Sequence, residues 1–135
     1  MKRYHSDKIW RQGKRILIVE DEPIICEICL KVLAKEGYEV EIANNGWEGE
    51  GKLKEKNYDL IIIDVRTPVM DGRQLYQKIT EKYPDMMRRV IMTSGEMLGS
   101  DMQSFLEKSG IPFFAQTVHI QRIKRGSQRC FRARE

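Results

Sequence analysis

Four short segments of the chain are almost continuously apolar, and a fifth alternates apolar with polar residues. A continuous apolar run of four or five residues is typical of a strand buried on both faces, and alternation is typical of a strand with one polar face. The predicted strands cover residues 15–19, 38–43, 60–63, 90–92 and 111–115.

Between these strands, apolar residues recur at the spacing of amphipathic helices. The first helix is predicted to begin at Pro23 and to end at Gly37. Its core face should consist of Ile25, Ile28, Cys29, Val32 and Leu33. The later helices are predicted through about Lys56, from Arg73 to Tyr83 and from about Ser100 to Ser109. This alternation of strand and helix predicts an α/β fold with a parallel sheet flanked by helices.

Polar and acidic residues follow three of the predicted strands. The strand at 60–63 ends on Asp64, the first strand runs into Glu20-Asp21-Glu22, and the fourth ends near Ser94. Because parallel strands bring their carboxyl ends to one edge of the sheet, we expect these groups to lie close together. Neighbouring carboxylates repel each other, so such a cluster indicates a hard cation such as Mg²⁺. Asp64 could then act as a nucleophile toward phosphorus, with Ser94 donating a hydrogen bond.

Each acidic residue also has a simpler interpretation when it is taken alone. Acidic side chains at positions 20–22 would stabilise the N-terminus of the following helix through its dipole. Asp71, followed by glycine, is typical of a turn. It is the combination of these residues that favours a site.

The 135 residues suffice for one domain, and their net charge of +4 is unevenly distributed. Residues 1–14 and 118–135 are basic, whereas the part between them is acidic. We expect residues 1–14 to be a flexible leader and 126–135 a disordered tail, on either side of a domain at 15–125. A basic tail can also attract nucleic acid non-specifically. No apolar stretch approaches the length of a membrane span, so a cytoplasmic protein without membrane contact is expected.

These motifs, in this order and spacing, resemble the receiver domain of two-component response regulators, and residues 94–113 are similar to receivers fused to hybrid histidine kinases. The matching positions are Glu20-Asp21, Asp64, Pro68, Asp71-Gly72 and Ser94. The resemblance implies a flavodoxin-like, doubly wound (βα)5 fold. It also implies that a histidine kinase or phosphotransfer protein transfers a phosphoryl group to Asp64, and that Ser94 is the switch hydroxyl.

The resemblance further implies a Mg²⁺ site. Asp21 and Asp64 would bind the ion through their side chains, Glu20 through water and Arg66 through its backbone carbonyl. The protein would not be a classical enzyme. It would signal through a downstream protein partner, and no DNA-binding domain is expected on this chain. A homodimer is compatible with the resemblance.

Two positions depart from the family pattern. Receivers carry a lysine where this chain has Gln116, and the aromatic switch position is Phe113, which has no hydroxyl. The resemblance stops at Gln116. The tail can be back-translated with permitted codons into a nucleotide sequence that, read one base later, encodes a lysine-proline motif followed by an amphipathic helix. We therefore hypothesise that residues 116–135 are a frame-shifted reading of an ordinary receiver end. The fifth helix should be short or degraded.

Three functions remain open at this stage. The first is a phosphorylatable signalling receiver, and the second is a degenerate receiver that acts as a non-switching protein-interaction module. The third is a phosphatase-type hydrolase with Asp64 as nucleophile. That reaction would need a general acid two residues further on, where Arg66 stands instead.

Overall fold

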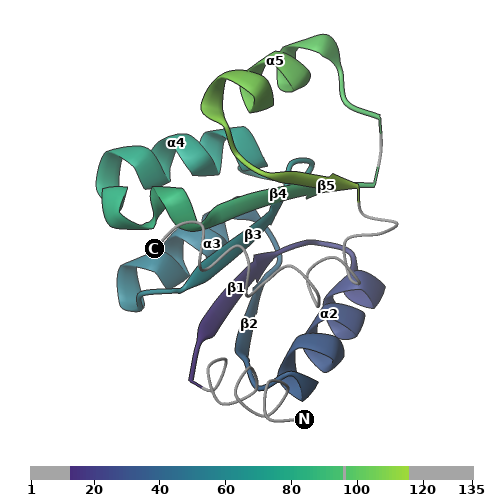
Figure 1. The fold of residues 1–135 in the computed structure, drawn as a ribbon, viewed down its shortest axis with the longest axis vertical. Helices are drawn as coiled ribbons and strands as arrows, with labels where there is room; N and C mark the ends of the chain where they lie inside the picture. Colours follow the sequence, from purple (N-terminus) through teal and green to yellow (C-terminus); the bar gives the residue numbers. More distant parts are fainter. Residues whose placement is uncertain (1–12, 96, 116–135) are drawn as a thin grey trace, which may run out of the picture.

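A computed structural model describes residues 13–95 and 97–115. They form one parallel sheet of five strands in the order β2-β1-β3-β4-β5 (Figure 1). The strands are β1 (Arg15–Val19), β2 (Glu39–Ala43), β3 (Leu60–Asp64), β4 (Val90–Ser94) and β5 (Phe113–Ala115). The predicted five-stranded parallel sheet flanked by helices is therefore confirmed.

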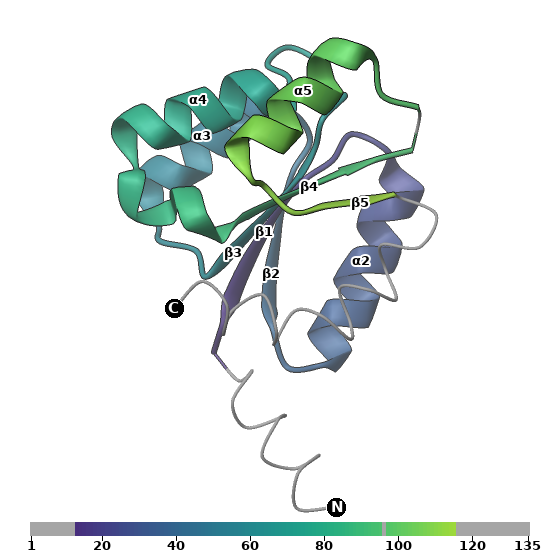
Figure 2. The same ribbon diagram turned by 45° about the horizontal axis from the view of Figure 1, so that its top comes forward.

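The helices lie on both faces of this sheet (Figures 1 and 2). They are α2 (Pro23–Lys35), α3 (Gly46–Glu55), α4 (Gly72–Lys82), the 3₁₀ helix η1 (Pro84–Arg89) and α5 (Ser100–Ser109). Figure 2 shows α2 on one face, with α3 and α4 on the other. None of these described helices is long and apolar enough to cross a membrane.

The side chains of each strand alternate between two hydrophobic cores. In β3, Ile61 and Ile63 pack with residues of α3, α4 and α5, whereas Leu60 and Ile62 pack with residues of α2. All five residues of β3 are buried. This burial on both faces explains why the segment reads as a continuous apolar run that ends abruptly on a carboxylate.

Side chains at the helix starts fix two of the helices. The Asn45 side chain accepts a hydrogen bond from the Glu48 backbone N–H and so caps α3. Asp71 and Gln74 form a reciprocal capping box at the start of α4. Because Asp71 follows the Asp64 loop directly, this cap also sets where that loop ends.

Two sequence expectations need correction, and three others lie beyond the described residues. Ile28 is not part of the core face of α2, because it is 37% exposed and lies about 100° around the helix from the buried Cys29. The fifth strand begins at Phe113 rather than at residue 111. Three predicted segments lie outside the described residues: the fifth helix, the tail at 126–135, and the leader at 1–14, of which only residues 13 and 14 are described.

Candidate functional site

The site lies where the strand order reverses. The chain passes from β1 outward to β2 and then returns to β3 on the other side of β1, so the loops after β1 and β3 diverge. Such a reversal leaves a crevice at the carboxyl ends of the strands. Val19 pairs with Ile63 in the parallel register, so the next residues, Glu20 and Asp64, emerge side by side.

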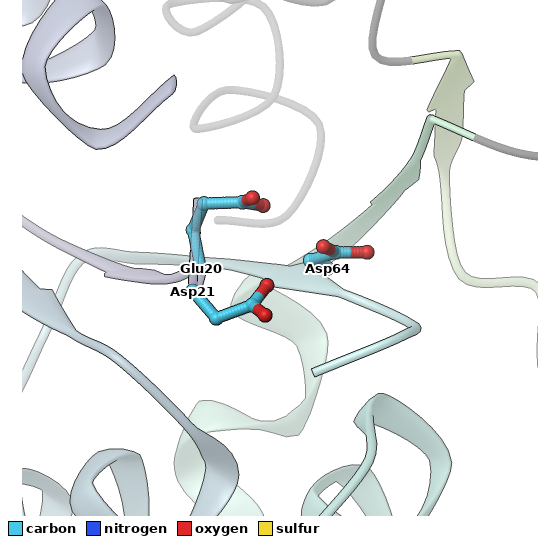
Figure 3. A group of neighbouring side chains, drawn as sticks. All are labelled: Glu20, Asp21 and Asp64. Carbon is cyan, nitrogen blue, oxygen red and sulfur yellow. The ribbon is translucent and has the colours of Figure 1, made fainter. Parts of the chain in front are cut away.

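Three carboxylates meet at this edge of the sheet (Figure 3). Each of Glu20, Asp21 and Asp64 contributes one oxygen, and these oxygens all lie within 4.8 Å of one another. Glu20 is 3% exposed and Asp64 7% exposed, whereas Asp21 is open to solvent. The grouping predicted from the sequence is thus present in the structure.

Burial, together with the neighbouring carboxylates, changes the protonation of Glu20. Burial, the charge of Asp64 and a hydrogen bond with the Asp64 carboxylate together raise the pKa of Glu20 to about 8. The Glu22 backbone N–H donates to Glu20 Oε1 at 3.2 Å and partly opposes this rise. Without a cation the group therefore holds a proton near neutral pH, so a cation would compete with that proton.

The donor atoms fit a hard divalent cation. All three are carboxylate oxygens, which Mg²⁺ and Ca²⁺ prefer, and two of them are buried at the end of a rigid sheet. One open side, at Asp21, leaves room for the waters that Mg²⁺ usually keeps. The residues present therefore fit the ion that the sequence implied.

The β3–α4 loop positions the Asp64 carboxylate. The Arg66 backbone N–H donates to Asp64 Oδ1 at 3.0 Å, and the Thr67 N–H lies 3.3 Å from the Asp64 carbonyl oxygen. The buried Thr67 hydroxyl donates to the Met70 carbonyl at 3.0 Å. The predicted role of the Arg66 carbonyl as a metal ligand stays a prediction.

Ser94 and Phe113 lie on the neighbouring strands β4 and β5. Asp64 pairs with Thr93, so Ser94 is one position beyond it on β4, and it is 3% exposed. Ser94 and Phe113 line a cavity of about 390 Å³ together with Met97, Leu98, Gln103 and Leu106. The predicted switch residues therefore share one cavity beside the carboxylates, whereas Gln116 lies outside the described residues.

Sequence reasoning missed one side chain at this edge. The sequence placed Arg66 as a backbone carbonyl ligand and in the position of a missing general acid, but in the structure its guanidinium Nη2 donates to the Met97 carbonyl at 3.2 Å. The contact joins two loops that are 31 residues apart in the chain. One feature of the sequence could have indicated this contact. Arg66 comes two residues after Asp64, and the strand that neighbours β3 in the sheet, β4, is followed by the loop that contains Met97.

Comparison with known proteins agrees with this geometry. The family model of the response regulator receiver domain matches residues 16–125, and the chain belongs to this family. A receiver domain protein (CheY-like) from Methanospirillum hungatei has a similar structure, with a TM-score of 0.80 and 29% identity over 90% of this chain and 95% of that one. The response regulator TrrA of Thermotoga maritima, solved in complex with Mg²⁺-BeF, has a TM-score of 0.71 and 29% identity, covering 87% of this chain and 98% of that one.

Two curated relatives are much longer proteins than this chain. The transcriptional regulatory protein YclJ of Bacillus subtilis is 40% identical over 67 residues, which is 50% of this chain and 30% of that protein. Hybrid signal transduction histidine kinase G of Dictyostelium discoideum is 49% identical over 63 residues, 45% of this chain and 2% of that protein. The matches therefore span less than a third of these relatives.

Proposed function

We propose that this chain is the phosphoacceptor receiver of a two-component phosphorelay, with Asp64 as the residue that is phosphorylated. The observation that carries the proposal is the buried Asp64 carboxylate at the end of β3, within 4.8 Å of two further carboxylates. A structural role alone would not gather three mutually repelling acids at the strand-order reversal.

The transfer takes place at one Asp64 carboxylate oxygen. That oxygen attacks the phosphorus of a phosphohistidine on a histidine kinase or phosphotransfer protein and forms a new O–P bond. The N–P bond breaks, and its electron pair remains on the imidazole nitrogen, which then takes up a proton. Asp64 Oδ1 accepts the Arg66 N–H, which holds the carboxylate in a fixed orientation.

The residues that would hold a divalent ion are Glu20, Asp21, Asp64 and the Arg66 backbone carbonyl. When bound, the ion supplies positive charge that offsets the charge gathered on the phosphoryl oxygens. Ser94, buried one strand away, would donate its hydroxyl to a phosphoryl oxygen. Ser94 and Phe113 line the same cavity. A shift of Ser94 on phosphorylation would therefore change the lining of this cavity, and a cytoplasmic protein partner would recognise the change.

Incorporation of phosphate from acetyl phosphate tests the proposal. The parent protein should become labelled in the presence of Mg²⁺ and lose most labelling when the metal is chelated. Asp64→Asn should abolish labelling, whereas Asp85→Asn, a change at an exposed residue of η1, should leave it intact. A parent that takes up no phosphate would favour a non-switching interaction module instead.

A further inference from the structure

The described loop residues at the carboxyl edge of the sheet carry very little positive charge. The described residues of its loops are 20–22, 44–45, 65–71, 95 and 97–99. Arg66 is the single lysine or arginine among them. The sequence also has a neutral residue, Gln116, just beyond β5. A second negative charge on Asp64 would therefore depend on Arg66 more than on any other described loop residue.

Arg66 is held at both ends by groups that border the site. Its backbone N–H donates to Asp64 Oδ1 at 3.0 Å, which fixes the start of the side chain beside the phosphoacceptor. Its guanidinium donates to the Met97 carbonyl at 3.2 Å, which fixes the other end on the β4–α5 loop. The side chain thus crosses from the end of β3 to the loop after β4.

The Met97 carbonyl is a weaker acceptor than a phosphoryl oxygen would be. The contact is exposed, since Met97 is 91% exposed and Arg66 is also accessible, and its acceptor is neutral. Phosphorylation raises the negative charge at Asp64 from one to about two and adds three strong acceptor oxygens. A guanidinium forms charge-assisted hydrogen bonds with such oxygens, and these bonds are roughly twice as strong as neutral hydrogen bonds.

We propose that Arg66 exchanges the Met97 carbonyl for a phosphoryl oxygen on Asp64, and thereby both neutralises the new charge and releases the β4–α5 loop. The inference rests on the proposed phosphorylation of Asp64. Met97 and Leu98 line the same cavity as Ser94 and Phe113. Release of this loop therefore changes the cavity wall, which makes Arg66 a link between the phosphoacceptor and the surface that a partner would contact.

Beryllofluoride with Mg²⁺ serves as the probe, because it forms a phosphoryl-like adduct with a carboxylate. In calorimetric titrations, Arg66→Met should weaken beryllofluoride binding about tenfold. Arg66→Lys should keep the affinity within about threefold of the parent, because the charge remains. The matched control is Arg73→Met, because Arg73 lies over the Phe105 ring at 5.0 Å and not at the crevice. Its affinity should equal that of the parent.

Hydrogen exchange of the amides at 97–99 provides a second readout. Beryllofluoride should speed exchange there in the parent protein, and it should cause no further change in Arg66→Met. Parent-like binding by Arg66→Met, equal losses in the Lys and Met variants, or an unchanged loop in the parent would overturn the inference. A parent that binds no beryllofluoride would instead overturn the proposed function, and this inference with it.

Discussion

Three glycines of α3 allow the same change, the addition of one methyl group, in three different surroundings. A Cβ at Gly46 would lie 2.1 Å from the Met70 carbonyl oxygen and 2.9 Å from its carbonyl carbon. At Gly49 it would meet only side-chain methyl groups, Val19 Cγ2 at 3.1 Å and Leu75 Cδ2 at 3.3 Å. At Gly51 it would meet nothing within 4 Å.

The expected effects follow from these distances. An ordinary contact is about 3.4 Å or longer, so Gly46→Ala must move α3 or the β3–α4 backbone by about 1 Å. Overpacking of this kind lowers the free energy of unfolding by about 1–3 kcal/mol, whereas the higher helix propensity of alanine raises it by less than about 1 kcal/mol. We expect a net loss of about 2 kcal/mol for Gly46→Ala, almost no change for Gly49→Ala, and a gain of about 0.5–1 kcal/mol for Gly51→Ala.

Urea denaturation of the three variants measures these differences directly. The free energy of unfolding should rank Gly51→Ala above the parent and Gly49→Ala, with Gly46→Ala lowest, at similar m-values. Gly46→Ala should also slow phosphorylation, because Met70 belongs to the loop that positions Asp64. Equal stability of Gly46→Ala and Gly51→Ala would refute the close approach of α3 to this loop.

Three further predictions concern the metal site, a surface ion pair and the loop backbone. Asp21→Ala should remove most of the rise in melting temperature that Mg²⁺ causes in the parent, since the ion binds the native state only; an unchanged rise would contradict the site. The Lys56 ammonium, 2.9 Å away, lowers the pKa of Glu41, so this pair stabilises the fold above pH 4.5 and its effect disappears as pH falls through the lowered pKa. Glu41→Gln should therefore cost about 0.5 kcal/mol in urea titrations at neutral pH and almost nothing in acid, and an equal cost at both would refute this. Val69 has φ 71° and is 80% exposed, so Val69→Gly should raise the free energy of unfolding by roughly 1 kcal/mol, and a loss would contradict backbone strain there.

The fold was predictable from the sequence where local signals agree. The helix at Ser100–Ser109 has the predicted bounds, because glycines flank it on both sides and Gly110 takes up the left-handed conformation at its end. The last strand was predicted too long. Pro112 lacks an N–H, and the ladder with β4 therefore starts only at Phe113, which pairs with Met92.

The grouping of acids at the site was predictable for a topological reason. Parallel strands place Glu20, Asp21 and Asp64 at one edge whatever the details of the helices. The guanidinium of Arg66 and the cavity beside Ser94 could not be predicted in this way. They depend on the conformation of one long side chain and on the path of the β4–α5 loop, and neither leaves a periodic pattern in the sequence.

The central claim is that Asp64 carries the phosphoryl group, and chemical trapping tests it most directly. Borohydride reduces an aspartyl phosphate to homoserine, so protein treated with acetyl phosphate and Mg²⁺ should yield, after reduction and digestion, a peptide with homoserine at position 64. Glu20, Asp21 and the other acids should remain unmodified. Homoserine at another position, or none in a protein that has incorporated phosphate, would contradict the account.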